Sequence, residues 1–336
     1  MKYDILVTGG LGYIGSHFIK HIKNKFKKIL VIDNSCTGSS DYILKNFEVI
    51  NSDLKNRSEL NACLKEKSFK TVVHFAAHAY VGESTKNCLK YAENNISGLI
   101  NLLKICEEVK VDNFVFSSSC ATYGSTSVDK AISENFKQDP INPYGWTKLV
   151  CEQLLKQLNT NIKIGVLRYF NAAGNDKDYI IGEDHNPETH VIPLIVETAL
   201  SQKFPDKFPE KKFTIFGNNY NTPDGTCLRD YIHVIDLCEA HLKCIEKLRV
   251  SPSGTNLSLN LGAGRGVSIL EIIREVEKKL DISMKYNVAE KREGDAPKLV
   301  ANVSLAKKIL GFNCKNSDIK EILEDVINYK LNKMKI

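Results

Sequence analysis

A tyrosine and a lysine four residues apart have the side chains of an acid/base pair. Tyr144 and Lys148 belong to the segment Tyr-Gly-Trp-Thr-Lys, which directly follows Asn142 and Pro143. Asparagine and proline are favoured at the N-cap and first turn of a helix, so both side chains are predicted to share one face near a helix start. The ammonium can then stabilise a phenolate and bring the phenol pKa down from about 10 toward working pH. Tyr144 is therefore a candidate for taking and giving a proton.

Ser119 strengthens this interpretation, because an isolated tyrosine-lysine spacing is more often an amphipathic helix with a half-buried tyrosine and a solvated lysine. The serine ends the run Ser117-Ser118-Ser119 after an apolar strand pattern. Ligands of parallel sheets bind outside the carboxyl ends of the strands, where Ser119 can hydrogen-bond a reacting oxygen or relay its proton. The predicted catalytic residues are Ser119, Tyr144 and Lys148.

A glycine-rich loop near the N-terminus predicts what these groups act with. Gly9, Gly12 and Gly15 follow a short apolar run, and a helix is expected to begin near Ile14. Glycines there let the backbone turn tightly and approach a pyrophosphate, and the helix N-terminus favours the anion. The next strand is predicted to end in Asp33, whose carboxylate can accept from a ribose 2′-hydroxyl and would repel a 2′-phosphate. The pattern favours NAD over NADP, and together with the acid/base pair it indicates hydride chemistry.

Short β-rich runs alternate with helical patterns through the first half of the chain. This alternation is typical of an α/β fold with a Rossmann-type, doubly wound parallel sheet. The predicted strands are Asp4–Val7, Ile29–Asp33, Glu48–Ile50, Thr71–Phe75, Asn113–Ser117 and Ile164–Phe170. Helices are predicted around Gly98–Glu108 and from about Pro143 to Leu158. Beyond Phe170 the pattern loosens, and later elements are expected at Phe213–Phe216, Leu257–Leu261 and 268–280.

This change of pattern predicts two lobes, and 336 residues with 43% hydrophobic content are enough to bury a core in each. Residues 1–170 are expected to form the NAD-binding domain, to which the chain returns around 232–262. Residues 171–336 are expected to form mainly a smaller, mixed α/β lobe that binds the substrate.

Composition excludes several classes of partner. The formal charge of +6 comes from lysines scattered over the whole length, without the block of like charges that binds nucleic acid or a membrane surface. No segment has the apolar length of a signal peptide or a membrane span. The 10 cysteines are dispersed without a Cys-x-x-Cys pair and are interpreted as core residues, not as disulfides or zinc ligands. We expect a cytoplasmic protein with no nucleic-acid or membrane partner.

Three other patterns are interpreted as structural. His185-Asn-Pro-Glu-Thr-His190 carries two imidazoles and a carboxylate, but its proline breaks a helix and no third ligand is evident, so no metal is expected. Gly262-Ala-Gly-Arg-Gly266 resembles a second nucleotide loop, yet Ser268 and Glu271 form a capping box that favours a plain strand-to-helix turn. Trp146 is expected only to pack in its helix.

Motifs that match one known family recur along nearly the whole chain. They are Thr8-Gly-Gly-Leu-Gly-Tyr-Ile-Gly15, Asp33-Asn34, His74-Phe-Ala-Ala, Val81-Gly-Glu-Ser, Ser117-Ser-Ser-Cys-Ala-Thr-Tyr-Gly124, Asn142-Pro-Tyr-Gly-Trp-Thr-Lys148, Leu167-Arg-Tyr-Phe-Asn171, Asp224-Gly-Thr-Cys-Leu-Arg-Asp-Tyr-Ile-His233 and Arg292-Glu-Gly-Asp295. In combination these segments resemble the UDP-glucose (UDP-galactose) 4-epimerases of the extended short-chain dehydrogenase/reductase superfamily.

The resemblance implies a cofactor, a substrate and the residues that hold them. It implies a tightly held NAD and reversible C4 epimerisation of UDP-glucose and UDP-galactose through a 4-keto sugar, with Tyr144 removing the O4 proton as hydride leaves C4. By resemblance, the cofactor-binding residues are Gly9, Gly12, Tyr13, Ile14, Gly15, Asp33, Asn34, Asp53, Leu54, Phe75, Ala76, Ala77, Asn94, Ser119, Tyr144, Lys148 and Phe170. The substrate-binding residues are Ser119, Tyr144, Asn171, His190, Thr214, Phe216, Arg229, Arg292, Asp295 and Leu299.

Two positions bear on how this chain differs within the family. Ala79 stands where many relatives have a lysine, so an ammonium contact to the cofactor is missing from that position. Leu299 stands where members vary between a bulky tyrosine and smaller residues, and a smaller side chain leaves room for an N-acetyl group. We therefore expect tolerance of UDP-GlcNAc and UDP-GalNAc alongside UDP-glucose. The resemblance also implies a homodimer, with helices around 98–108 and 149–158 at the interface.

Other functions make different demands on the residues. A 4,6-dehydratase needs an acid/base pair at the catalytic strand end, usually within Thr-Asp-Glu, whereas this chain has Ser119-Cys120-Ala121 and no carboxylate there. A UDP-xylose/UDP-arabinose 4-epimerase stays open, because the segment Phe75–Ser84 also resembles that branch. A non-catalytic NAD-sensing module stays open as well, since fold does not imply function, although the presence of Ser119, Tyr144 and Lys148 together speaks against it.

Overall fold

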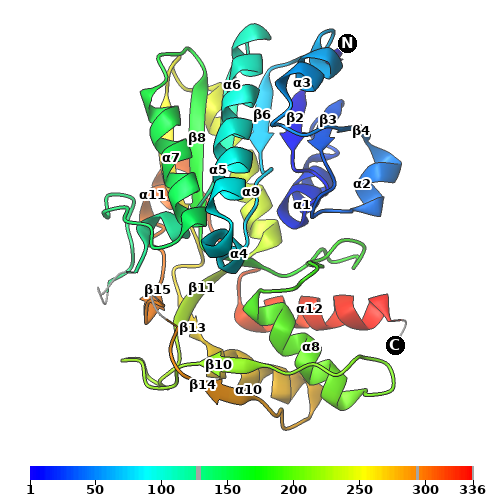
Figure 1. Cartoon of the computed structure of the whole chain (residues 1–336), viewed down its shortest axis with the longest axis vertical. Helices are drawn as coiled ribbons and strands as arrows, with labels where there is room; N and C mark the ends of the chain where they lie inside the picture. The colour runs from blue at the N-terminus through cyan, green and yellow to red at the C-terminus, as the bar shows by residue number, and fades with distance from the viewer. Residues whose placement is uncertain (126–129, 293–294, 335–336) are drawn as a thin grey trace.

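A seven-stranded parallel sheet forms the larger lobe of the computed structural model, which describes residues 1–125, 130–292 and 295–334 (Figure 1). Its strand order is β12-β8-β7-β6-β2-β3-β4. The chain moves outward from β2 to β4 on one side and from β6 to β12 on the other, so the order reverses between β2 and β6. The strands are β2 Ile5–Thr8, β3 Ile29–Asp33, β4 Glu48–Asn51, β6 Thr71–His74, β7 Asn113–Ser119, β8 Lys163–Tyr169 and β12 Asn256–Leu261. The predicted Rossmann-type sheet is confirmed.

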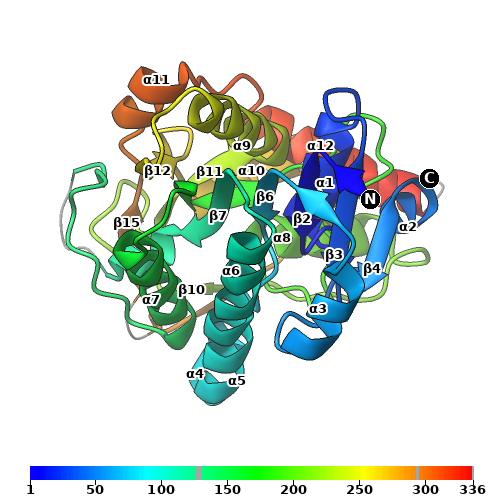
Figure 2. The same ribbon diagram turned by 90° about the horizontal axis from the view of Figure 1, so that it is seen from above.

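Alternate strand residues build a separate apolar core on each face of this sheet. Val7 faces the core shared with α1 (Tyr13–Ile22) and α9 (Val234–Arg249). Its neighbour Leu6 faces the core shared with α3 (Arg57–Leu64), α6 (Gly98–Glu108) and α7 (Pro143–Gln157). Figure 2 shows α9 on one side of the sheet and α6 and α7 on the other. Strands buried on both faces carry continuous apolar runs, which is why the sequence pattern predicted them.

The predicted helices and later strands are confirmed, with small differences at their ends. α7 begins at Pro143 because the Gly145 N–H donates to Asn142 Oδ1 at 2.8 Å, as expected of an N-cap. The segments predicted at 213–216 and 268–280 are β10 (Thr214–Phe216) and α10 (Ile269–Leu280). Trp146, which was expected to pack in its helix, is 43% exposed. α7 buries its opposite face, including Cys151, against the sheet.

A smaller mixed lobe packs beneath the carboxyl edge of the sheet (Figure 1). In it β9 (Asn171–Ala173), β11 (Leu228–His233), β13 (Gly266–Ser268) and β15 (Lys298–Leu299) form one sheet, while β10 pairs with β14 (Asn287–Ala289). Three helices, α8 (Val191–Lys203), α10 and α12 (Ile319–Lys333), share an apolar core with these strands. The smaller α/β lobe expected for the C-terminal part is therefore present.

Later segments of the chain return to the larger lobe. β12 pairs with β8 in the main sheet, and α9 packs on α1. α11 (Ser304–Leu310) also joins this core through Ala306 and Leu310, although it lies in the stretch expected to form mainly the smaller lobe. Within the described ranges, no helix is long and apolar enough to cross a membrane. The remaining elements are β1 Lys2–Tyr3, β5 Ser68–Phe69, α2 Asp41–Asn46, α4 Val81–Lys86, α5 Cys88–Ala92, a π-helical turn at Glu93–Ser97 and a 3₁₀ turn at Cys120–Tyr123.

Candidate active site

A pocket opens at the carboxyl ends of β2, β3 and β6, where the strand order reverses. Open parallel sheets bind nucleotides at this point. The predicted cofactor residues that line the pocket are Gly9, Gly12, Asp33, Asn34, Asp53, Leu54, Phe75, Ala76, Ala77 and Asn94. Lining residues that the sequence reasoning missed are Ile32, Cys36, Thr37, Gly38, Ser52 and His78. The small and polar residues directly after β3 are a sequence signal that would have found several of these.

Two glycines of the loop allow close backbone approaches that a side chain would block. Gly9 has a φ of +72°, and a Cβ at this position would lie 2.5 Å from the amide nitrogen of Ala76. A Cβ on Gly15 would collide with the carbonyl oxygen of Gly9. The loop therefore sits tightly between β6 and the start of α1, and leaves the helix N-terminus open to a pyrophosphate.

Asp33 anchors the glycine loop as well as lining the pocket. Its Oδ2 accepts from the Leu11 N–H at 2.9 Å, and its Oδ1 accepts from the Ser35 N–H at 2.8 Å. Burial raises the pKa of Asp33, and these two backbone donors oppose the shift. A carboxylate at the end of this strand suits ribose hydroxyls and disfavours a 2′-phosphate. The cradle of glycines and the acid at the strand end together fit NAD.

A π-helical turn at Glu93–Ser97 links the pocket to the helix that carries the tyrosine and lysine. Asn94 lines the pocket. The next residue, Asn95, is buried and donates from Nδ2 to Thr147 Oγ1 at 3.0 Å, while its Oδ1 accepts from the His78 N–H at 2.8 Å. Such π turns are frequent at functional sites. Asn95, which sequence reasoning missed, thus holds the pocket wall and α7 in a fixed relation.

Ser119, Tyr144 and Lys148 meet at the carboxyl end of β7, the strand next to β6. Lys148 is buried, and its Nζ donates to the Ser117 carbonyl at 2.7 Å and lies 6.0 Å from the centre of the Tyr144 ring. Ser119 ends the strand, and its Oγ accepts from the Ala121 N–H at 3.1 Å. The side chain of Ser119 also lies close to that of Tyr144, and this contact acts to lower the phenol pKa. The structure therefore assembles the acid/base group that the sequence predicts.

The pKa values of this group differ from the sequence expectation. Desolvation raises the pKa of Tyr144 to about 12 and outweighs the lowering effect of the neighbouring Ser119. Desolvation lowers the pKa of Lys148 to about 8. The prediction that the ammonium brings the phenol pKa toward working pH is wrong for this structure, because burial disfavours both charged forms and Lys148 Nζ turns to a backbone carbonyl.

A buried ion pair that the sequence did not indicate lies next to the predicted catalytic residues. Glu152 follows Lys148 by one turn of α7, and its Oε2 accepts from Arg168 Nη2 at 2.6 Å and from Nε at 3.0 Å. Ser118, the neighbour of Ser119, donates to the same carboxylate. The side chains of the arginine and the glutamate are only 7% and 6% exposed. This pair ties α7 to β7 and β8 and so fixes the helix that carries the acid/base group.

Predicted substrate residues form a chain of contacts on the smaller lobe. The Arg292 guanidinium lies 4.9 Å from the centre of the Phe216 ring, and its Nε donates to Asp295 Oδ2 at 2.9 Å. Asp295 Oδ1 also lies 3.8 Å from Arg229 Nη2. Leu299 is paired with Arg229 between β15 and β11. Two arginines therefore share one carboxylate, and an incoming diphosphate would compete with it for both.

The remaining predicted substrate and cofactor residues lie outside the arginine contacts and the lining of the pocket. Asn171 adjoins the arginine cluster, since its Nδ2 donates to the Asp230 carbonyl at 3.0 Å, and Thr214 begins β10. The His190 imidazole instead turns to Glu183, with 2.5 Å between Nδ1 and Oε1. Among the described residues, predicted cofactor contacts that do not line the pocket remain predictions, namely Tyr13, Ile14, Gly15, Ser119, Tyr144, Lys148 and Phe170.

The second glycine loop is a structural turn, as predicted. Asp230 fills it by accepting from the Ala263 N–H at 2.7 Å and the Gly264 N–H at 3.0 Å. Ser268 Oγ accepts from the Glu271 N–H at 3.0 Å and caps α10. A buried protein carboxylate thus occupies the backbone donors that a phosphate would need.

Comparisons with known proteins agree with this site. The model of the NAD dependent epimerase/dehydratase family matches residues 5–262. The UDP-glucose 4-epimerase of Rhizobium meliloti (strain 1021) is 40% identical, with 97% of this chain and 96% of the relative covered. The structure of UDP-glucose 4-epimerase from Brucella ovis in complex with NAD is 39% identical, covers 97% of this chain and 98% of its own, and has a TM-score of 0.87. The structure of the UDP-Glc/GlcNAc 4-epimerase from Campylobacter jejuni is 34% identical, covers 98% of this chain and 99% of its own, and has a TM-score of 0.81.

The matches to the two UDP-glucose 4-epimerases each cover 97% of this chain and confirm the resemblance to that family. The cofactor is NAD, as the glycine loop and Asp33 predict. The chain belongs to the NAD-dependent epimerase/dehydratase family.

Proposed function

We propose that this chain interconverts UDP-glucose and UDP-galactose by epimerisation at C4. The observation that carries the proposal is the meeting of Ser119, Tyr144 and Lys148 next to an NAD pocket, with no carboxylate in Ser119-Cys120-Ala121 to eliminate water. These groups can move a proton at one sugar oxygen and do nothing further to the substrate. The relatives named as epimerases support an isomerase over a non-catalytic NAD-sensing module.

Each catalytic side chain has a distinct part in this reaction. When bound, NAD supplies the acceptor and the donor of the hydride. Tyr144 takes the O4 proton as the 4-keto sugar forms, and gives it back once the sugar has turned its other face to the cofactor. Ser119 hydrogen-bonds the reacting oxygen and the phenol, and Lys148 supplies positive charge as the phenolate forms. Oxidation and reduction cancel within one turnover.

The smaller lobe is proposed to hold the UDP end of the substrate. Arg229 and Arg292 would grip the diphosphate in place of Asp295, which already positions both guanidinium groups. Phe216, 41% exposed beneath Arg292, offers an apolar face at the same place. A firm hold on UDP leaves the sugar lightly contacted, and a sugar that must rotate between two hydride transfers needs that freedom.

Turnover without added cofactor tests the proposed reaction. Purified protein is incubated with UDP-glucose, UDP-GlcNAc and UDP-xylose in turn, without NAD, and the epimers are separated by chromatography. We expect conversion of UDP-glucose, because NAD is regenerated in every cycle and stays in its pocket. Conversion of UDP-xylose alone would assign the chain to the UDP-pentose branch, and no conversion of any sugar with NAD bound would contradict epimerisation.

Leu299 is proposed to set tolerance for N-acetylhexosamines. It lies beside Arg229 at the edge of a buried cluster that includes Phe170, so a larger side chain here would fill space on the sugar side. Leu299→Tyr should lower kcat/KM for UDP-GlcNAc by about 10–200-fold and change that for UDP-glucose little. Leu299→Met keeps the volume and should leave the substrate ratio unchanged. Wild-type protein that turns over UDP-glucose but shows no detectable UDP-GlcNAc turnover would sink this idea.

Residues 1–170 and 232–262 are proposed to form the NAD-binding domain. The protein is proposed to be a cytoplasmic homodimer. The free cysteines of the described chain suit a reducing compartment. α6 and α7 each cover the sheet with one face, and Leu89 on the neighbouring α5 is 84% exposed. Sedimentation velocity should give a mass of twice the 37.7 kDa of one chain. Leu89→Lys should lower the measured mass toward that of a single chain. Wild-type protein that sediments as a single chain at micromolar concentration would refute the dimer.

A further inference from the structure

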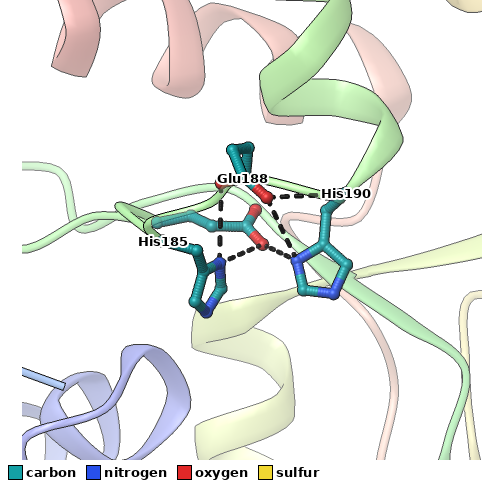
Figure 3. Close-up of side chains that lie close together, drawn as sticks. His185, Glu188 and His190 are labelled. Carbon is teal, nitrogen blue, oxygen red and sulfur yellow. Dashed lines mark hydrogen bonds and ion pairs between the residues drawn. The ribbon is translucent and has the colours of Figure 1, made fainter. Parts of the chain in front are cut away.

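The loop that leads into α8 gathers four side chains that carry metal-ligand atoms. One ligand atom from each of Glu183, His185, Glu188 and His190 lies within 4.8 Å of all the others. Figure 3 shows His185, Glu188 and His190 turned toward one another. Within the ranges 1–125, 130–292 and 295–334, this is the only such group of histidine, cysteine and carboxylate residues. The loop is non-helical, as its proline predicts, but Glu183 supplies the further ligand that sequence reasoning did not find.

Three separations between imidazole nitrogens and carboxylate oxygens are longer than good hydrogen bonds and close to the edges of a metal tetrahedron. His185 Nδ1 lies 3.5 Å from Glu183 Oε1 and 3.5 Å from Glu188 Oε2, and His190 Nδ1 lies 3.6 Å from Glu188 Oε1. Zinc bonds of about 2.0–2.1 Å place tetrahedral ligands about 3.3 Å apart. Between the imidazoles and the carboxylates, His190 Nδ1 and Glu183 Oε1 are hydrogen-bonded, at 2.5 Å. Glu188 Oε1 accepts from the backbone N–H groups of Thr189 and His190, at 2.7 and 2.8 Å. Binding of a metal would lengthen the contact between His190 and Glu183 and draw the other ligand atoms, which lie within 4.8 Å of one another, closer together.

Unpartnered polar atoms point independently to a ligand. Glu183 Oε2, Glu188 Oε2 and His185 Nδ1 are buried and have no hydrogen-bond partner. The side chains of Glu183 and Glu188 are only 2% and 5% exposed. Buried carboxylates are costly unless they are paired or coordinate a metal. Protonating both imidazoles would balance the charge, yet His185 Nδ1 is too far from either carboxylate to hydrogen-bond it.

The ligand set of two imidazoles and two carboxylates indicates which cation the site would bind. Calcium and magnesium prefer sites made of oxygen alone, whereas zinc accepts nitrogen and oxygen ligands in a four-coordinate site. We propose that Glu183, His185, Glu188 and His190 bind one Zn²⁺ per chain. The ring of His185 packs edge-on against Tyr13 and Tyr80, with centroids 6.1 and 5.9 Å away. Both tyrosines belong to the larger lobe, so the ion would fasten the loop before α8 to the NAD-binding side.

Zinc titration of the full chain tests the site. Protein stripped with a chelator, with its exposed thiols Cys36 and Cys88 blocked because thiolates also bind zinc, is titrated by calorimetry and then melted. We expect one equivalent of Zn²⁺ per chain and a Tm raised by about 2–4 °C at excess zinc. His185→Ala and Glu188→Gln should each weaken Kd by at least about 10–100-fold. Glu188→Gln keeps the side-chain shape, so its metal-free Tm should stay near that of the wild type.

His21→Ala is the matched control. His21 pairs with Glu239 at 3.0 Å on the surface, outside the cluster, so its loss should leave the single equivalent and its Kd unchanged. Wild-type protein that binds no zinc would overturn the proposal, whether or not the variants fold. Equal zinc binding by wild type, His185→Ala and Glu188→Gln would overturn it too, because the ion would then lie elsewhere.

Discussion

Replacing Tyr144 with phenylalanine should lower kcat for epimerisation by about 10²–10⁴-fold while NAD stays bound. The change removes one oxygen and leaves the ring beside Lys148, so the fold and the pocket at β2, β3 and β6 are unaffected. What is lost is the group proposed to take the O4 proton while the 4-keto sugar forms. The measurement is kcat by separation of UDP-glucose from UDP-galactose, together with the NAD released on denaturing a known amount of protein.

Trp146 supplies the control for that experiment. It lies two residues further along α7 and is 43% exposed, so Trp146→Phe alters the same helix without touching the acid/base group. Its kcat should stay near the wild-type value. If Tyr144→Phe kept full activity with NAD bound, a different residue would have to be the base, and Ser119 would be the next to replace.

The main sheet was predictable from the sequence because its signals are local. Strands covered on both faces must be mostly apolar, and residues 5–7 and 29–32 are apolar without interruption. Asn142 and Pro143 define the start of α7 by the same local logic. The placement of α11 was not predictable, because no helix was expected at Ser304–Leu310 and its packing with α9 joins residues far apart in the chain.

In the candidate active site too, the residues marked by local motifs were predictable, and the features that depend on distant parts of the chain were not. Ser119, Tyr144 and Lys148 were found because each lies in a short motif, and the glycine loop was found by its spacing. The pKa of Tyr144 was predicted wrongly, because burial depends on residues from other elements and no local pattern reports it. The Glu183 to His190 cluster was dismissed for a related reason. The fourth residue of the cluster, Glu183, lies outside the segment His185 to His190, and only the folded loop places it beside the other three.

Arg168→Met should lower the free energy of unfolding by about 3–5 kcal/mol. The guanidinium donates three hydrogen bonds to the Glu152 carboxylate and one to Tyr123 Oη at 2.9 Å, all of them buried. Methionine fills a similar volume but leaves the carboxylate charged and without its counter-ion. Urea unfolding followed by circular dichroism measures the loss. Arg57→Met, which breaks an exposed pair with Glu108, should cost no more than about 1 kcal/mol.

A second substitution separates the cost of the stranded charge from that of the lost contacts. In Arg168→Met/Glu152→Gln the charge is gone, while the amide oxygen can still accept from Ser118 or from Gln138, whose Nε2 now lies 2.9 Å from Oε2. Because the penalty comes mainly from an uncompensated buried charge, the double variant should regain most of the stability. A double variant as unstable as Arg168→Met would show that the arginine stabilises α7 through its other hydrogen bonds. In that case the ion pair itself would not be what holds the catalytic helix against β7 and β8.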